Sequence, residues 1–210
     1  MIMGIKEAER LFNSLFEKRN SSPYPFSEKH QTELINHLVA TAEIAKTIAE
    51  NTPYLNPEKS YVYGLLHDYG RIVDERREGI FHGLAGYYAL INDYPDIAKI
   101  CLTHSFPDKD LDIEKKPMPR EMLLGCIPLI RNIQYDDYDR LIQLCDNINK
   151  FGMPCTIEER YKDIAERYNV SLESLQPLID SLNGLKIYFG NMCNKDVYEI
   201  IGLKNENTGL

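Results

Sequence analysis

Apolar side chains recur along almost the whole chain at the three- and four-residue spacing of α-helices, and no segment shows the strict alternation of a half-buried β-strand. The clearest apolar stripe begins at Val62 and continues three, four, seven, ten and eleven residues later, so its members share one helical face. The same spacing predicts helices at residues 4–19, 27–51, 57–73, 82–93, 95–104, 119–131, 136–150 and 156–168, with a further helix after Ser171. The predicted fold class is therefore all-α.

Residues that cap helices mark several of the boundaries. Ser27 stands where an N-cap is expected, and Thr156 with Glu159 has the spacing of a capping box. Gly152–Pro154 is the candidate linker. We expect three segments: an N-terminal helix and loop at residues 1–26, a helical core at residues 27–151, and a C-terminal helical extension at residues 152–210 that packs on the core.

Length and composition favour a fold that an apolar core holds together. With 210 residues and 43% hydrophobic residues, the chain can bury a large core without disulfides or a structural metal, so we expect any metal to be catalytic. The five cysteines are odd in number and show no C-x-x-C spacing, which argues against a disulfide framework or a thiolate zinc site. We expect them to be reduced thiols.

The charge balance excludes several classes of partner. Lysine and arginine number 24 against 32 acidic residues, and the net charge of −8 repels duplex nucleic acid and anionic membranes. The sequence contains no apolar run of the roughly 18 residues that a membrane span needs, and its start lacks the apolar core of a signal peptide. These features predict a cytoplasmic protein with a small-molecule substrate, and they leave the oligomeric state open.

Histidine placement is the most informative feature of the chain. There are five histidines, and four of them fall on different predicted helices: His37, His67, His82 and His104. The fifth, His30, lies early in its helix with no motif partner, and we expect it to be exposed.

Asp68 follows His67 directly, and the two share a helical face with Gly64 and Arg71. This helix is otherwise apolar all round, so its polar stripe is expected to face an internal cleft rather than bulk water. Imidazole and carboxylate groups together suit Fe, Mn or Zn.

The predicted helix at residues 136–150 carries another candidate acid. Asp146 lies at the edge of the apolar stripe of this helix, where a buried carboxylate would need a partner. Asp137 and Asp139 are expected on the exposed side of the same helix.

The order of these residues along the chain, His37, His67-Asp68, His82, His104 and Asp146, resembles the HD-domain superfamily of metal-dependent phosphohydrolases. The resemblance spans about half of the chain and implies an HD-domain-like helical bundle. It implies that His37, His67, Asp68 and Asp146 are the core metal ligands. It further implies that His82 and His104 hold a second divalent ion, with Asp68 bridging the two, and that the ions are Fe or Mn, with Zn as an alternative.

A phosphohydrolase acting on a small phosphorylated molecule, with a nucleotide as the favoured candidate, is the function that this resemblance implies. The metal would polarise a phosphoryl oxygen, and a water activated at the metals would attack in line. Asp68 would steer the proton of the water, and Arg71 would contact the phosphate unless it forms a structural ion pair with Asp74 or Glu75. Three further cations follow the loop after His104 and could approach the cleft: Lys115, Lys116 and Arg120.

Two other functions fit the same ligand set. A branch of the superfamily that resembles myo-inositol oxygenase is a di-iron oxygenase with equivalent ligands, and a regulatory module would bind a nucleotide without turnover. Ser105 and Phe106 follow His104 in place of a GYP signature, so the chain is a poor match to the cyclic-dinucleotide phosphodiesterases of the superfamily.

Overall fold

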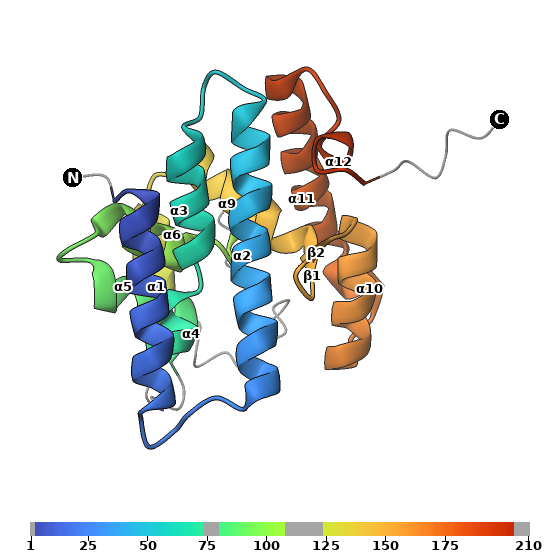
Figure 1. Cartoon of the computed structure of the whole chain (residues 1–210). Helices are drawn as coiled ribbons and strands as arrows, with labels where there is room; N and C mark the ends of the chain where they lie inside the picture. Colours follow the sequence, from blue (N-terminus) through green and yellow to red (C-terminus); the bar gives the residue numbers. More distant parts are fainter. Residues whose placement is uncertain (1–2, 74–79, 108–123, 204–210) are drawn as a thin grey trace.

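The structure, a computed structural model, describes residues 3–73, 80–107 and 124–203 (Figure 1). Its helices are α1 (Ile5–Asn20), α2 (Glu28–Glu50), α3 (Pro57–Leu66), α4 (Tyr69–Val73), α5 (His82–Leu90), α6 (Pro95–Thr103), α8 (Ile127–Asn132), α9 (Asp137–Asn147), α10 (Ile157–Tyr168), α11 (Leu172–Cys193) and α12 (Val197–Ile200). Strands β1 (Asn149–Lys150) and β2 (Met153–Pro154) form the one hairpin of this described part. The predicted all-α class is confirmed. Within the same residues, no helix combines the length and apolar character that crossing a bilayer requires.

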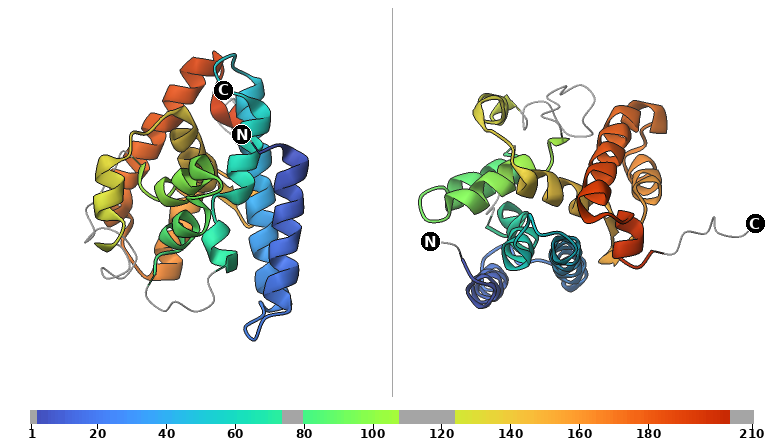
Figure 2. Two further views of the ribbon diagram at one scale, coloured as in Figure 1. Left: turned by 90° about the vertical axis from the view of Figure 1, so that its left-hand side faces the viewer. Right: turned by 90° about the horizontal axis from the view of Figure 1, so that it is seen from above.

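Helix α9 occupies the centre of the bundle. On one side of it, α3 packs between α1 and α2, while α6 pairs with α5, which also contacts α4. On the other side, α10 pairs with α11 (Figure 2). Because α9 itself contacts α2, α3, α6 and α11, a side chain on α9 can meet residues from both sides of the molecule.

Predicted caps begin three of these helices. The side chain of Ser27 accepts a hydrogen bond from the backbone N–H of His30 at the start of α2. Thr156 and Glu159 form the predicted capping box of α10, and Ser171 caps α11. Each cap satisfies an N–H group that has no partner within its own helix.

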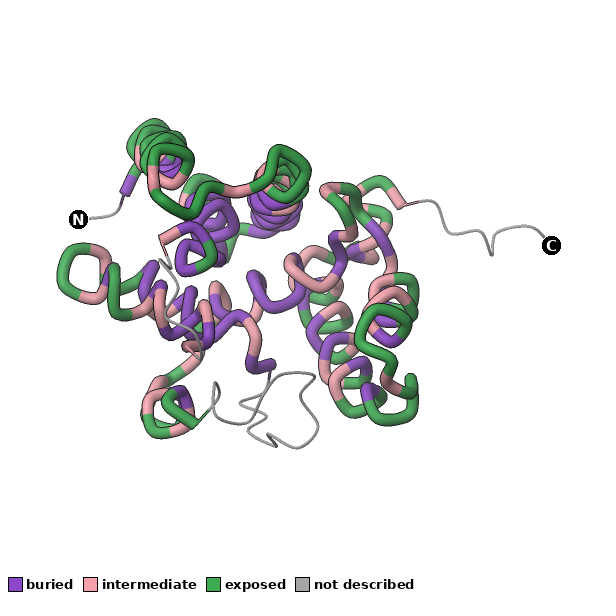
Figure 3. The backbone as a smooth tube through the Cα atoms, turned by 90° about the horizontal axis from the view of Figure 1, so that it is seen from below, coloured by how far each residue is buried: buried purple, intermediate pink, exposed green. Residues whose placement is uncertain are grey.

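The predicted apolar stripes form the core. Buried positions lie on the helix faces that turn toward one another, whereas the outer faces of α1 and α2 are exposed (Figure 3). The stripe of α9 is fully buried at Leu141, Leu144, Cys145 and Ile148. All five cysteines are free thiols.

The helix predicted at residues 57–73 is interrupted at His67 and Asp68, which form a turn between α3 and α4. A local contact accompanies the interruption. The Nδ1 atom of His67 lies 2.7 Å from the carbonyl oxygen of Gly64, which in a continuous α-helix would accept the N–H of Asp68.

Two helices are shorter than predicted, and the range predicted for a third lies partly outside the described residues. Helix α5 ends at Leu90 and α9 at Asn147, while only the part of the 119–131 prediction from residue 124 onward is described. The candidate linker Gly152–Pro154 belongs to the β1–β2 hairpin, whose strands are too short to produce a visible alternation in the sequence.

Gly64 provides a test of how closely α2 and α3 pack. A Cβ atom at this position would lie 2.6 Å from Ala42 Cα and 2.9 Å from the Thr41 carbonyl oxygen. Because backbone atoms cannot move aside easily, Gly64→Ala should lower the free energy of unfolding by about 1–3 kcal/mol despite the better helix propensity of alanine. Urea unfolding measures the change.

Gly184→Ala is the matched control, because a Cβ atom at that helical position meets nothing within 4 Å. It should raise the free energy of unfolding by about 0.5–1 kcal/mol. A Gly64→Ala protein as stable as the Gly184→Ala protein would contradict the close packing of α2 on α3.

Candidate metal centre

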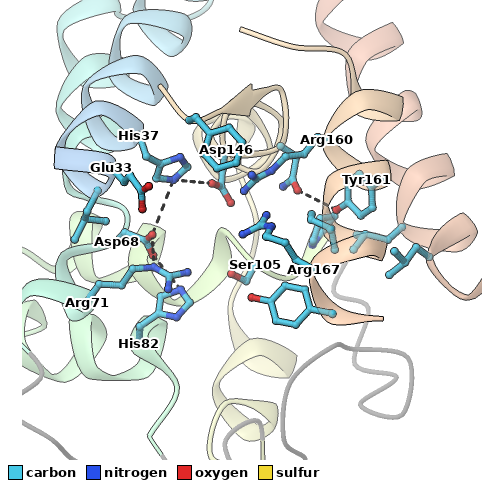
Figure 4. A pocket seen from close by; sticks show the side chains of 18 of the residues that line it. Glu33, His37, Asp68, Arg71, His82, Ser105, Asp146, Arg160, Tyr161 and Arg167 are labelled. Carbon is cyan, nitrogen blue, oxygen red and sulfur yellow. Dashed lines mark hydrogen bonds and ion pairs between the residues drawn. The ribbon is translucent and has the colours of Figure 1, made fainter. Parts of the chain in front are cut away.

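Six side chains predicted from the sequence converge in the interior of the bundle, and five separate helices or turns carry them. His37 comes from α2, and Asp146 comes from α9 (Figure 4). His67 and Asp68 occupy the turn between α3 and α4, His82 is the first residue of α5, and His104 directly follows α6. The structure therefore brings together residues that are far apart in the sequence.

The first group contains His37, His67 and Asp146. The Nε2 atoms of the two histidines are 3.3 Å apart. The Oδ1 atom of Asp146 lies 3.0 Å from His37 Nε2 and 3.6 Å from His67 Nε2. Asp68 approaches this group with Oδ2, which is 3.8 Å from His67 Nε2 and 4.0 Å from His37 Nε2.

The second group contains His82 and His104 and faces the other oxygen of Asp68. Asp68 Oδ1 lies 2.9 Å from His82 Nε2 and 3.4 Å from His104 Nε2, and the two histidine nitrogens are 3.1 Å apart. Asp68 Oδ1 is a buried atom that accepts no hydrogen bond in the structure. The two oxygens of one carboxylate thus point to two separate sets of imidazole nitrogens.

In two histidines, the ring nitrogen that points away from the cluster donates a hydrogen bond to a backbone carbonyl. His67 Nδ1 donates to the Gly64 carbonyl at 2.7 Å, and His104 Nδ1 donates to the Cys101 carbonyl at 2.8 Å. In a neutral ring this leaves the lone pair of Nε2 facing the cluster, which is the tautomer that a metal-binding histidine requires.

Buried Asn149 supports His37, and the sequence analysis missed it. Its Nδ2 donates to the His37 carbonyl at 2.8 Å and to Thr41 Oγ1 at 3.0 Å, and lies 3.2 Å from His37 Nδ1. Its Oδ1 accepts the N–H of Gly152 at 3.1 Å, which fixes the orientation of the amide. No sequence motif marks this residue, because His37 and Thr41, to which its amide donates, lie more than 100 positions away.

The electrostatics of the cluster keep its carboxylates ionised. Burial alone would raise the pKa of Asp68, but the nearby Arg71, His82 and His67 hold that pKa well below its ordinary value. Burial would likewise raise the pKa of Asp146, and its hydrogen-bonding contacts with His37 and His67 hold it well below the ordinary range.

His82 and His67 differ in the direction in which their surroundings shift the pKa. Burial and the nearby Arg71 lower the pKa of His82 to about 4, so this ring is neutral near pH 7. Burial would lower the pKa of His67 as well, but the carboxylates of Asp68 and Asp146 outweigh it and raise that pKa.

A divalent cation fits this arrangement. Nitrogen lone pairs and ionised carboxylate oxygens converge, and a buried oxygen of Asp68 has no hydrogen-bond donor. Two overlapping sets of residues have ligand atoms close enough to hold an ion: His37, His67 and Asp146, and His67, Asp68 and His104. Mixed nitrogen and oxygen donors are typical of Fe, Mn and Zn sites.

A cavity of about 390 Å³ opens beside the cluster, and α10 lines its opposite wall. Arg160 and Arg167, seven residues apart on α10, line this wall together with Tyr161 (Figure 4). Arg160 Nε is buried and has no hydrogen-bond partner in the structure, whereas Arg167 pairs with Asp163 at 2.7 Å. The sequence analysis missed both arginines, although their spacing of seven placed them on one helical face.

Arg71 lies at the cluster, but its partner is Asp68. Its Nε atom is 2.5 Å from Asp68 Oδ2, and its side chain is 47% exposed at the cavity. The alternative partners Asp74 and Glu75 lie outside the described residues, as do three other predicted cations: Lys115, Lys116 and Arg120. His30 is exposed, as expected, and contributes to the cavity lining.

The prediction that Asp139 is exposed is wrong, because it is fully buried between α9 and α6. Its Oδ1 accepts a hydrogen bond from Thr103 Oγ1 at 2.7 Å, and its Oδ2 lies 2.8 Å from Lys99 Nζ. Gln143, one turn along α9, donates to the Thr103 carbonyl. These contacts fix α9, which carries Asp146, against the end of α6, which precedes His104.

A family model, the HD domain, matches residues 34–169, more than half of the chain. The chain belongs to the HD domain family. This confirms the resemblance drawn from the ligand pattern, and the family is of the metal-dependent hydrolase type and binds divalent metals. Comparisons with curated proteins and with solved structures give no match.

Asn149→Ala tests whether the residue that holds His37 matters for metal binding. Loss of the amide removes the contacts to the His37 carbonyl and to Thr41, so the affinity for Mn²⁺ should fall by about 10- to 100-fold. Competition with a chelating indicator measures the affinity. Asn132→Ala is the control, since its amide donates only to the Pro128 carbonyl on the exposed helix α8. Equal affinities in the two variants would contradict the role of Asn149.

Proposed function

We propose that this protein is a metal-dependent phosphohydrolase that releases phosphate from a small phosphorylated molecule of the nucleotide class. The observation that carries the proposal is the joining of two features in one cavity. The histidine and aspartate cluster forms one wall, and Arg160, with a buried and unpartnered Nε, lies on the opposite wall. A buried guanidinium nitrogen that has no hydrogen-bond partner among the described residues would be stabilised by an anionic ligand.

Two divalent ions, with Fe or Mn preferred over Zn, are our proposal for the metal content. His37, His67 and Asp146 would hold one ion, His82 and His104 the other, and Asp68 would contribute one oxygen to each. When bound, such ions supply Lewis-acid stabilisation for a phosphoryl oxygen.

The protein residues around the cluster have separate tasks in this proposal. Asp68 stays ionised because of its low pKa, so it can orient the attacking water as a hydrogen-bond acceptor. Arg71 and Arg160 offer guanidinium groups from α4 and α10 to the oxygens of the phosphate. Stabilisation of charge that develops on these oxygens contributes a few kcal/mol to catalysis, on the order of what one such donor supplies elsewhere.

The arginines argue against the oxygenase, and the complete ligand set argues against the regulatory module. An oxygenase of the HD superfamily could use the same six ligands, but an uncharged substrate would leave Arg160 without a partner. A regulatory module that binds a nucleotide would satisfy the arginine without requiring a complete ligand set. The proposal therefore rests on the ligand set and the arginines lining the same cavity.

Phosphate release from a panel of nucleotides and sugar phosphates, with Mn²⁺, under air and under argon, tests the proposal. Release should be equal in both atmospheres, because hydrolysis consumes no oxygen. Asp68→Asn should reduce the rate to background and lower the bound metal, because the amide cannot bridge two cations. Asp180→Asn, a change on the exposed face of α11, is the control and should behave as wild type.

Oxygen consumption by the iron-loaded protein without phosphate release would favour the oxygenase instead. Saturable nucleotide binding without any product would favour the regulatory module. Either result would overturn the phosphohydrolase proposal.

Arg160→Ala should lower kcat/KM for the best phosphorylated substrate by about 10- to 100-fold, through loss of one charge-assisted contact. Arg71→Ala should lower it by about 10- to 1000-fold, and Arg71→Lys should recover only part of the loss, because an ammonium lacks the two-donor fork. Metal content should stay unchanged in all three, since the two alanine variants remove a nearby cation, which does not disfavour binding of a metal ion, and Arg71→Lys keeps the charge.

Steady-state kinetics and elemental analysis on the same preparations provide the measurements. Arg131→Ala, on the exposed part of α8, is the control. An Arg71→Ala protein that lost its metal would instead assign Arg71 to structural support of Asp68.

A further inference from the structure

The turn that joins β1 to β2 has an unusual residue at its tip. Phe151 has φ of 54° and Gly152 has φ of 84°, so both central residues are in the left-handed region, as in type I′ hairpin turns. Asparagine followed by glycine is the preferred pair there. The other non-glycine residues with positive φ in the described part are Asn169 and Asn194, which cap helices. A phenylalanine in this conformation costs free energy that asparagine would not.

The hairpin around Phe151 is firmly attached to the helix that carries His37. Gly152 packs so closely on α2 that a Cβ atom there would lie 2.6 Å from the Cβ of Asn36. The N–H of Gly152 donates to Asn149, whose amide holds the backbone of His37. The position of Phe151 is therefore fixed relative to the metal centre.

Packing within the protein does not offset the unfavourable backbone of Phe151. The residue is 58% exposed, and Lys150 Nζ lies 5.5 Å from the centre of its ring. Nevertheless Phe151 lines the cavity beside the metal centre. Strained residues that persist without a packing reason are concentrated at ligand-binding sites.

Apolar side chains accompany Phe151 around the cavity and come from three helices: Leu34 of α2, Ile164 of α10, and Leu175 and Leu178 of α11. The cavity thus combines charged groups that suit a phosphate with apolar surface that suits an uncharged, ring-shaped group. Its volume of about 390 Å³ falls in the range of pockets that hold drug-sized ligands.

We propose that Phe151 is a specificity-determining residue that stacks on the base of a nucleotide while the phosphate lies at the metal centre. This inference rests on the proposed function and narrows its substrate class to phosphate esters that carry a flat aromatic ring. Sugar phosphates without such a ring would lose the contact.

Nucleoside 5′-monophosphates and ribose 5-phosphate are the matched substrates, because they share the phosphate and sugar and differ by the base. The Mn²⁺-loaded wild-type protein should have a lower KM for at least one nucleotide than for ribose 5-phosphate. Phe151→Asn should raise KM for that nucleotide by about 5- to 100-fold and remove most of the preference, because stacking on an aromatic side chain is lost. Phe151→Tyr should keep the preference.

Thermal unfolding separates this role from a purely structural one. Phe151→Asn places the residue preferred by the turn at its tip, so its midpoint of unfolding should rise while nucleotide recognition falls. Tyr188→Asn, a change at an aromatic residue of α11 that is 41% exposed, is the control for loss of a surface ring and should leave the preference intact.

A Phe151→Asn protein that keeps the nucleotide preference would overturn the inference, as would equal KM values for nucleotides and ribose 5-phosphate in the wild type. Both results would leave the proposed phosphohydrolase function standing. If no substrate releases phosphate, the proposed function fails, and calorimetric binding of the same nucleotides against ribose 5-phosphate decides the role of Phe151. Equal or absent binding would then overturn it.

Discussion

A carboxylate that is only 3% exposed inside an apolar helical bundle is stable only if positive charge or hydrogen-bond donors surround it. Asp68 meets this condition with Arg71 at one oxygen and His82 near the other, and with His67 and His104 close by. These partners come from the end of α3 and from α4, α5 and α6, so all of these elements must meet at one point. The surroundings of this charge therefore depend on the arrangement that the apolar core gives to these helices. Asp68 Oδ1 faces the ring nitrogens of His82 and His104 but accepts no hydrogen bond among the described residues, so its lone pairs are available to a cation.

The metal centre also requires close packing of the helices that carry its histidines, because an imidazole ring reaches only a short distance from its own backbone. A Cβ atom on Gly64 would collide with α2, and one on Gly86 would lie 2.9 Å from the Cβ of Cys101 on α6. The absence of side chains at these positions lets α2 approach α3, and α5 approach α6, so that His37 reaches His67 and His82 reaches His104. The glycines therefore contribute to the chemistry although they touch no ligand.

Local signals and the ligand pattern could be predicted from the sequence, because each depends on residues close together in the chain or on chemically distinctive side chains. Ser27 and Thr156 identify helix starts. Four histidines on separate predicted helices, one of which is otherwise apolar, indicate a shared cleft. Tertiary contacts decide the rest. Asp139 looks like an exposed acid in a helical pattern, but Thr103 and Lys99, on a different helix, bury it. Arg160 has no motif, and only the packing of α10 and α11 beside α9 places it across the cavity from the metal centre.

The candidate ligands and several other residues of the cavity come from different stretches of the chain. This explains why the ligand pattern identifies a family without identifying a substrate. Elements α2 to α9 supply the six candidate ligands, whereas the stretch that follows Asp146 supplies Asn149, Phe151, Arg160 and Arg167. One continuous segment thus positions a ligand helix and also forms the far wall of the cavity. The hydrogen bonds of Asn149 connect the hairpin to the backbone of His37, so the cavity lining and the metal centre share this segment. Under the proposed function, residues 149–152 would therefore serve both the positioning of His37, through Asn149, and the recognition of substrate, through Phe151.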